Sequence, residues 1–309
     1  MADPGTAGNE QKIAVIGLGS MGLGMATSLA RAGFAVSGYD RSPAALERSR
    51  RAGIATATHP AAAAHDADAV VTVVVNAMQT ETVLFAAEGA VPAMRKGGIV
   101  ISCSTMAPAD ARRFASAAGE QGTRYLDAPM SGGSMRAAEG ALTFLASGPS
   151  ATYEMARPIL EAMAQTVYHL GEEVGIGAAF KMVNQLLAGV HIAAACEALT
   201  FAKKLGLDLP QVYEVICSAA GNSWMFQNRG PHVVEGDYAP RSAVEIFVKD
   251  LGIVEDIARA ERFPTPLAGA ALQLFLMTAS AGMAGDDDAS VARLYAKIAG
   301  LELPGPAAP

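Results

Sequence analysis

The chain of 309 residues has few cysteines, few charged side chains and no long run of charge of one sign. Its three cysteines, Cys103, Cys196 and Cys217, stand far apart without a CxxC spacing. This pattern excludes a disulfide framework or a zinc ribbon and fits a reducing cytoplasm. The five histidines form no HExxH or similar pair, so we expect no metal site.

Acidic residues outnumber basic ones, with 30 Asp and Glu against 23 Lys and Arg and a formal net charge of −7. Nucleic-acid binding needs clustered positive charge, so we expect no nucleic-acid partner. The most apolar stretch, 186–202, includes Glu197, whereas a membrane span needs about 20 residues nearly free of charge. The polar residues 1–11 lack the apolar centre of a signal peptide. We therefore expect a cytoplasmic protein with a mobile N-terminal tail at 1–11.

Apolar side chains are abundant instead. They make up 51% of the chain, while charged residues make up only 17%, against roughly 25% in an average protein. This composition excludes a disordered chain. It also predicts more buried surface than one subunit needs, and hence a homodimer or homotetramer.

The two halves of the chain differ in pattern. Residues 12–173 alternate apolar runs with helical stretches, and continuous apolar runs are typical of parallel strands covered on both faces. This alternation predicts an α/β domain of the Rossmann-like type. Residues 174–309 have helical spacing, with a long helix at 178–205, and predict an all-helical domain for substrate binding and dimerisation. The strands are expected at 12–16, 35–39, 69–75, 99–103, 124–127 and 142–147.

A glycine motif of the form GxGxxG follows the first predicted strand and opens a helix. Gly17 permits a tight turn, Gly19 lets the backbone approach a pyrophosphate, and Gly22 allows close packing of helix and strand. The free N–H groups and the helix dipole favour phosphate at this position. The motif predicts that a dinucleotide contacts Gly17, Leu18, Gly19, Ser20, Met21 and Gly22.

The residue that ends the second predicted strand is acidic. Asp40 follows Gly17 by 23 residues, near the ~20 expected for a carboxylate that accepts hydrogen bonds from the adenosine ribose. A 2′-phosphate there would meet a like charge, which favours NAD over NADP. Arg41 leaves NADP open, because an arginine at this turn can pair with that phosphate. The alternative is an ordinary tight turn with a surface carboxylate.

Three more motifs follow the glycine loop: DAPMSGG at 127–133, GxGxxxK at 175–181 and KDL at 249–251. With GLGSMG at 17–22, they resemble the β-hydroxyacid dehydrogenase family, which includes 3-hydroxyisobutyrate dehydrogenase and tartronate semialdehyde reductase. The resemblance extends from residue 12 to about 298. It implies hydride transfer between NAD and a small hydroxy acid, in a cleft between the two domains. Within the family, four stretches resemble the L-threonate dehydrogenases: 73–85, 185–199, 223–229 and 242–254.

The resemblance implies that Lys181, the lysine of the GxGxxxK motif, is the general acid or base. A lysine on an apolar helix between two domains loses part of its hydration, which favours the neutral amine that can accept a proton. The alternative is a solvated lysine on a helix surface. A rival function of another class is a non-catalytic dinucleotide-binding sensor, which would have no need for Lys181.

The remaining site residues also come from the resemblance. Asn184 and Gln185 follow Lys181 by three and four positions, so they share its helix face and are expected to orient the lysine or the substrate. The commonest family pattern has Asn at position 185, which leaves the substrate open. The resemblance assigns the substrate carboxylate to Ser131, Gly132 and Gly133. It assigns the cofactor to Val74, Val75, Asn76, Thr105 and Lys249. The alternative for Lys249 is a surface salt bridge with Asp250 or Glu245.

Overall fold

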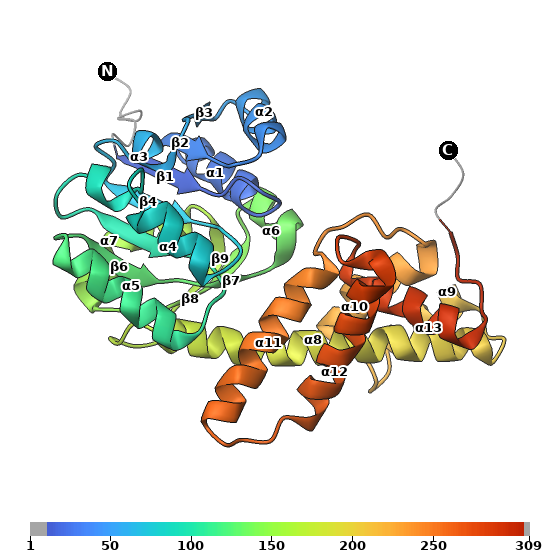
Figure 1. Ribbon diagram of the computed structural model, residues 1–309. Helices are drawn as coiled ribbons and strands as arrows, with labels where there is room; N and C mark the ends of the chain where they lie inside the picture. Colours follow the sequence, from blue (N-terminus) through green and yellow to red (C-terminus); the bar gives the residue numbers. More distant parts are fainter. Residues whose placement is uncertain (1–10, 306–309) are drawn as a thin grey trace. The chain divides into compact units, whose positions relative to one another are not determined.

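The computed structural model describes residues 11–305, which form two compact units (Figure 1). The first unit extends to Lys181 and the second begins at Met182, so the division falls inside helix α8 (Ile176–Lys204). The predicted boundary between residues 173 and 174 lies shortly before this helix. The predicted tail at 1–11 lies outside the described residues except for Gln11.

The first unit contains a six-stranded sheet with the order β3-β2-β1-β4-β5-β6, and all its pairings are parallel. The predicted Rossmann-like fold is therefore confirmed. The predicted strand at 69–75 is shorter, because the chain leaves the sheet after Thr72 and turns towards the start of α4 at Ala77. The strands are β1 (Lys12–Ile16), β2 (Ala35–Tyr39), β3 (Ala55–Thr56), β4 (Ala69–Thr72), β5 (Ile99–Ser102) and β6 (Arg124–Asp127). The helices are α1 (Gly22–Arg31), α2 (Pro43–Arg51), α3 (Pro60–Ala63), α4 (Ala77–Phe85), η1 (Val91–Ala93), α5 (Pro108–Glu120), α6 (Gly133–Glu139) and α7 (Ser150–Glu161).

Both faces of this sheet are buried, which explains the uninterrupted apolar strands. In β1, Ile13 and Val15 belong to a core that includes residues of α1 and α7. Ala14 and Ile16 belong to a second core with residues of α4 and α5. Successive side chains of a strand point to opposite faces, so one short strand supplies both cores.

A second, three-stranded sheet lies in the same unit and was not predicted as a separate element. It consists of β7 (Met130–Ser131), β8 (Leu142–Ala146) and β9 (Ala164–His169), with β7 antiparallel and β9 parallel to β8. An antiparallel bridge between Asp127 and Ser147 links the end of β6 to the end of β8. This small sheet holds the predicted carboxylate-binding segment.

The second unit is helical, as predicted, and α8 runs into its core. Ile192 and Leu199 of α8 pack with Phe247 of α11 and Phe275 of α12. The rings of Phe247 and Phe275 are stacked with centroids 5.1 Å apart. The other elements of this unit are α9 (Leu209–Cys217), α10 (Trp224–Glu235), α11 (Val244–Ala260), α12 (Pro266–Thr278), η2 (Ala279–Met283), η3 (Asp288–Ser290) and α13 (Val291–Ala299).

Two buried carboxylates fix the segment that leads into α11. Asp287 lies 2.7 Å from His232 Nδ1 and accepts a hydrogen bond from the Arg241 backbone N–H, while Arg229 makes two hydrogen bonds to Asp288. Burial opposes ionisation of Asp287, but the hydrogen bond and charge of His232 hold the pKa of this carboxyl below its usual range. Buried charges are costly unless they are paired in this way. The cluster therefore anchors the start of α11, the helix that contains Lys249.

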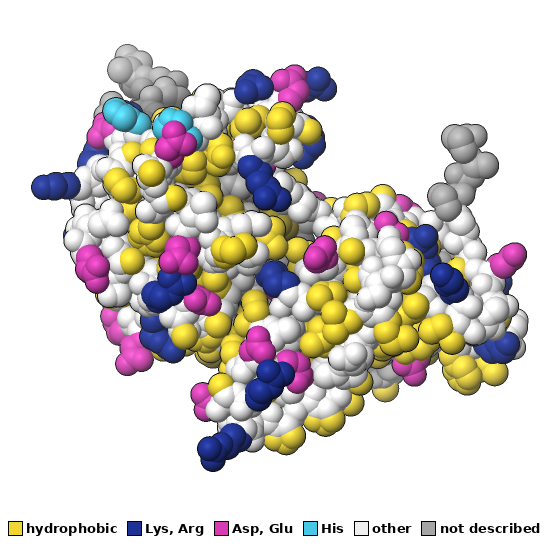
Figure 2. Space-filling view, in the orientation of Figure 1, with side chains coloured by type: hydrophobic (Ala, Val, Ile, Leu, Met, Phe, Trp, Pro, Cys, Tyr) yellow, Lys and Arg dark blue, Asp and Glu magenta, His cyan; other side chains and the backbone are white. Residues whose placement is uncertain are grey.

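Two segments are long and apolar enough to span a membrane by length and composition alone, Ile176–Lys204 and Pro266–Met283. The first segment is α8, which is a core helix of the second unit. Only 22% of the second segment is buried, and its Leu267 and Met277 are 70% and 46% exposed. Hydrophobic side chains are frequent on the viewed surface of the unit that contains this segment (Figure 2).

Candidate active site

The glycine loop has the geometry that its motif requires. Gly17 has a φ of +98°, and a Cβ there would lie 2.7 Å from the Val73 carbonyl oxygen. A Cβ on Gly22 would lie 1.8 Å from the Gly17 carbonyl oxygen, so a side chain cannot fit at either position. At Gly19, by contrast, a Cβ would meet nothing within 4 Å. Gly17 and Gly22 thus allow the loop to fold, and Gly19 keeps open the space that a pyrophosphate needs.

Helix α1 begins with no side chain capping it, among the residues that the structure describes. The first N–H groups of a helix lack intrahelical partners, and the positive end of the helix dipole lies there. Such a terminus favours a phosphate group. The chain therefore offers a fitting position for the pyrophosphate of a dinucleotide.

Asp40 directly follows β2 and has a structural role that the sequence did not reveal. Its Oδ2 accepts a hydrogen bond of 2.8 Å from the Leu18 N–H inside the glycine loop. Its Oδ1 accepts another of 2.8 Å from the Ser42 N–H at the start of α2. The carboxylate thus joins the phosphate loop to the β2–α2 turn, next to the exposed Arg41.

The other predicted cofactor residues lie at the same edge of the sheet. Val74, Val75 and Asn76 follow β4, and Thr105 follows β5, at the carboxyl ends where ligands bind to open α/β sheets. Asn76 is already engaged, because its Oδ1 accepts a hydrogen bond of 2.8 Å from the Gln79 N–H and caps α4. The structure brings these segments to the edge where the glycine loop lies.

The predicted carboxylate-binding segment begins in β7. Ser131 pairs with Thr143 of β8, and the two glycines that follow have positive φ angles, +141° at Gly132 and +77° at Gly133. Residues with a Cβ rarely adopt these conformations. The glycines therefore let the chain turn from β7 directly into α6.

Lys181 lies in the second turn of α8 and is 7% exposed. This burial contradicts the alternative of a solvated surface lysine. It is consistent with the predicted need for a partly dehydrated amine. Nothing in the structure tests the proton transfer itself, so the catalytic role stays a prediction.

Asn184, Gln185 and Lys249 are joined by hydrogen bonds and an ion pair in the second unit. The Asn184 Nδ2 donates a hydrogen bond of 2.9 Å to Gln185 Oε1, and the Gln185 Nε2 donates one of 2.5 Å to Asp250 Oδ2. The Lys249 Nζ lies 2.5 Å from Asp250 Oδ1. The alternative prediction of a salt bridge between Lys249 and Asp250 is thus correct in its partner, but Asp250 is buried, so the pair is not an ordinary surface pair.

Two acidic residues of the motifs have roles beyond those predicted, since Asp127 had no predicted role and Asp250 was predicted only as a possible partner of Lys249. Asp250 of KDL is the shared partner of Gln185 and Lys249. Asp127, the first residue of DAPMSGG, accepts hydrogen bonds at the start of α8. The presence of these two residues in the motifs could have indicated that they are important. The sequence does not show which hydrogen-bond donors they contact.

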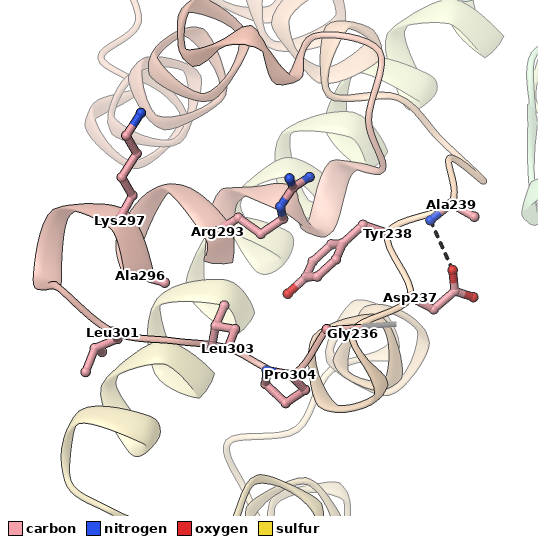
Figure 3. Close-up of a pocket in the computed structure, with 11 residues that line it drawn as sticks. Gly236, Asp237, Tyr238, Ala239, Arg293, Ala296, Lys297, Leu301, Leu303 and Pro304 are labelled. Carbon is pink, nitrogen blue, oxygen red and sulfur yellow. Dashed lines mark hydrogen bonds between the residues drawn. The ribbon is translucent and has the colours of Figure 1, made fainter. Parts of the chain in front are cut away.

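A pocket of about 690 Å³ in the second unit contains none of the predicted site residues. Figure 3 shows Tyr238, Arg293 and Lys297 around it. Arg293 is already paired, with its Nη1 2.6 Å from Asp286 Oδ2 and its guanidinium over the Tyr238 ring. Among residues 11–305 there is also no group of three or more His, Cys, Asp or Glu side chains that could hold a metal ion.

Comparison with known proteins identifies the family. A family model described as the NAD binding domain of 6-phosphogluconate dehydrogenase matches residues 12–171. A second model, the NAD-binding of NADP-dependent 3-hydroxyisobutyrate dehydrogenase, matches residues 175–295. The L-threonate dehydrogenase of Cupriavidus necator is 50% identical over 297 residues, which are 96% of this chain and 99% of that protein. The chain belongs to the 3-hydroxyisobutyrate dehydrogenase family.

Other members of this family are also similar along their whole length. The L-threonate dehydrogenase of Haemophilus influenzae is 47% identical over 293 residues, which are 94% of this chain and 96% of that protein. A crystal structure of 3-hydroxyisobutyrate dehydrogenase from Salmonella typhimurium has a TM-score of 0.88 and 45% sequence identity. That comparison covers 92% of this chain and 100% of the other.

The family assignment confirms the predicted class of enzyme. The chain is a hydroxyacid dehydrogenase with an NAD-binding domain, as the resemblance implied. The rival interpretation as a non-catalytic sensor finds no support among these relatives. The roles of individual site residues stay predictions.

Proposed function

We propose that this chain oxidises L-threonate with NAD as the hydride acceptor. The observation that supports the substrate best is the 50% identity to the L-threonate dehydrogenase of Cupriavidus necator, which covers 96% of this chain. This similarity includes both the NAD-binding unit and the helical unit. It therefore includes every segment predicted to contact the cofactor or the substrate.

The residues present fit a dinucleotide. Gly19 leaves open space beside the uncapped start of α1, where the pyrophosphate would lie. Asp40 would accept hydrogen bonds from the adenosine ribose while keeping its bonds to Leu18 and Ser42. When bound, NAD supplies the acceptor for the hydride.

Lys181 would move the proton. Oxidation of the carbinol carbon removes a hydride and the hydroxyl proton, and a neutral Lys181 amine would accept that proton. In the reverse direction the ammonium form would donate the proton to the carbonyl oxygen. The burial of this side chain excludes most of the water that would otherwise compete for the proton.

The polar groups proposed to recognise the substrate suit a polyhydroxy acid. Ser131, Gly132 and Gly133 would bind the carboxylate without an arginine. Gln185 has both ends of its amide engaged, with Asn184 and Asp250, so we assign it the role of orienting Asn184. Asn184 would then present its amide oxygen to a substrate hydroxyl.

The test is a comparison of hydroxy acids with purified enzyme, followed by the absorbance of reduced nicotinamide. L-Threonate, D-erythronate and 3-hydroxyisobutyrate would each be offered with NAD and with NADP. A site that hydrogen-bonds a hydroxyl discriminates strongly against an analogue without it, so we expect kcat/KM for L-threonate to exceed that for 3-hydroxyisobutyrate by about 100-fold or more. Turnover of 3-hydroxyisobutyrate without turnover of L-threonate would reject the proposed substrate.

The second candidate is 3-hydroxyisobutyrate. The structure named 3-hydroxyisobutyrate dehydrogenase from Salmonella typhimurium is 45% identical to this chain, nearly as similar as the named L-threonate dehydrogenases. The same comparison of substrates distinguishes the two candidates, because L-threonate has hydroxyl groups that 3-hydroxyisobutyrate lacks.

We also propose that the enzyme is a homodimer or homotetramer. Val183 and Leu187 on α8, and Leu267 and Met277 in the α12 segment, expose large apolar side chains. A second copy of the chain would remove this surface from water. Light scattering after gel filtration should give a multimer, and Leu267→Glu should lower the measured mass, whereas Met155→Glu on α7 should not. A monomeric wild-type protein would contradict the proposal.

The proposed compartment is the cytoplasm. All three cysteines are free thiols, and two of them, Cys103 and Cys196, are buried. Free thiols are usual where glutathione and thioredoxin keep the compartment reducing. Fractionation of cells that express the protein would place it with the soluble cytoplasmic marker enzymes, and recovery in the membrane fraction would contradict the proposal.

A further inference from the structure

Helix α8 begins in an unusual way, because its first N–H groups are satisfied by residues far away in the sequence. Asp127 Oδ2 accepts hydrogen bonds from the Ala178 N–H at 2.8 Å and from the Gly175 N–H at 3.2 Å. Ser147 Oγ accepts one of 2.8 Å from the Gly177 N–H. A helix terminus is normally capped by a residue adjacent to it. Here two other segments of the fold provide the cap.

The two capping residues are themselves hydrogen-bonded to each other and buried. Asp127 ends β6 and Ser147 follows β8, and their backbones exchange hydrogen bonds of 3.1 and 2.7 Å. The Ser147 hydroxyl also donates a hydrogen bond of 3.3 Å to Asp127 Oδ2. Both side chains are essentially inaccessible to solvent, with exposures of 1% and 0%. Solvent therefore does not reach these two side chains at the start of the helix.

The backbone of α8 lies very close to the backbone of β8 at Gly177. A Cβ on Gly177 would lie 2.1 Å from the Leu145 carbonyl oxygen, so only glycine permits the approach. The Leu145 N–H in turn donates a hydrogen bond of 2.9 Å to the Pro129 carbonyl oxygen. Pro129 lies two residues before Ser131, in the segment predicted to bind the substrate carboxylate. The same contacts thus tie the start of α8 to that segment.

Burial raises the pKa of Asp127 to about 6, although the hydrogen bonds from Ala178, Ser147 and Gly175 oppose the increase. A carboxylate kept at a buried position against this desolvation needs compensating interactions. The N–H groups of α8 and the positive end of its dipole provide them. Burial of this carboxyl group is unfavourable by itself, which is consistent with a role of Asp127 in holding the start of α8.

We propose that Asp127 and Ser147 are positioning residues, which fix the start of α8 and thereby the place of Lys181 relative to the substrate-binding segment at 129–133. Lys181 follows Ala178 by three residues, about 4.5 Å along the helix axis, so a shift of the first turn moves the lysine with it. The inference rests on the proposed role of Lys181 in proton transfer. Neither Asp127 nor Ser147 contacts the substrate in this account.

The experiment compares Asp127→Asn, Asp127→Ala and Ser147→Ala with the wild-type enzyme. A displacement of about 1 Å in a reacting group can lower the rate about 100-fold, so we expect Asp127→Ala to reduce kcat by about that factor. Asp127→Asn keeps one acceptor oxygen and should retain more activity. Ser147→Ala loses the hydrogen bond that the hydroxyl accepts from the Gly177 N–H and the one that it donates to Asp127, and should reduce kcat about threefold or more. The dissociation constant of NAD should stay within about twofold of wild type for all three, because the glycine loop is not touched.

A kinetic isotope effect separates positioning from a loss of folded enzyme. With L-threonate deuterated at the carbon that is oxidised, slower chemistry should increase the primary isotope effect on kcat in the variants. Loss of folded enzyme would lower kcat without changing the isotope effect. The control is Asp208→Ala, which removes a carboxylate cap at the start of α9, where Asp208 Oδ2 accepts a hydrogen bond of 3.1 Å from the Gln211 N–H. This control should leave kcat and the isotope effect unchanged.

Unchanged kcat in Asp127→Ala and Ser147→Ala would overturn the inference, as would a lower kcat with an unchanged isotope effect. If the Asp127 variants do not fold, Ser147→Ala decides by the same two readouts. Activity of Lys181→Ala near the wild-type level would instead reject the proposed function. The two failures are therefore distinguishable.

Discussion

Asp40→Ala tests the proposal that the carboxylate that holds the phosphate loop also binds the ribose. The substitution removes the acceptors of two backbone N–H groups, those of Leu18 and Ser42. Hydrogen bonds to buried charged groups contribute about 1.5–3 kcal/mol each, and we take about 1 kcal/mol each because Asp40 is partly exposed. The total of about 2 kcal/mol corresponds to about 30-fold weaker NAD binding.

Isothermal titration calorimetry with NAD and with NADP measures the effect. If Asp40 only repelled a 2′-phosphate, its removal would strengthen NADP binding. The hydrogen bonds of Asp40 to Leu18 and Ser42 predict a different result. Without them the phosphate loop is less well ordered, so Asp40→Ala should bind NADP no better than wild type does. Asp40→Asn, which keeps one acceptor, should fall between wild type and Asp40→Ala. Arg41→Ala is the control and should leave the affinity for NAD within about twofold.

Unchanged NAD affinity in Asp40→Ala would refute the reasoning. A large gain in NADP affinity would show that charge repulsion by Asp40, and not its hydrogen bonds to the phosphate loop, dominates at this position.

Two further predictions follow from the glycine loop and from the buried carboxylates. Gly22→Ala should lower Tm and abolish NAD binding, because its Cβ would lie 1.8 Å from the Gly17 carbonyl oxygen, whereas Gly19→Ala should keep the wild-type Tm and weaken only NAD binding. Equal Tm values for these two variants, measured by differential scanning calorimetry, would contradict the packing argument. The pKa of Asp287 is lowered below its ordinary value of 3.8, so its contribution to stability is present above pH 3.8 and is lost as the pH falls below that value. Asp287→Asn should therefore show a smaller decrease of Tm on acidification than wild type, and an identical decrease would contradict the assignment.

Much of the fold follows from the sequence because its signals are local. The apolar runs of β1, β4 and β5 report burial on both faces, and the spacing of Gly17, Gly19 and Gly22 reports a turn of one kind. The separate sheet around β8 was not predicted, because short strands do not reveal which partner they pair with. The burial of Lys181 agreed with the expectation from its apolar helix.

Contacts over long sequence separations could not be predicted. The capping of α8 by Asp127 and Ser147 joins residues about 30 to 50 positions apart, and the sequence contains no periodic signal for such a contact. The same is true of the hydrogen bond between Gln185 and Asp250, which are 65 positions apart. The motifs identified the segments that matter, and the structure identified the atoms that hold them.

The most direct test of the central claim is the turnover of Lys181→Ala at saturating NAD and L-threonate. Loss of a general base typically lowers the rate about 100- to 10,000-fold, and the account predicts a fall in kcat within this range. It also predicts that the dissociation constant of NAD stays within about twofold of wild type, because the glycine loop does not depend on this side chain. Turnover within about tenfold of wild type would contradict the account.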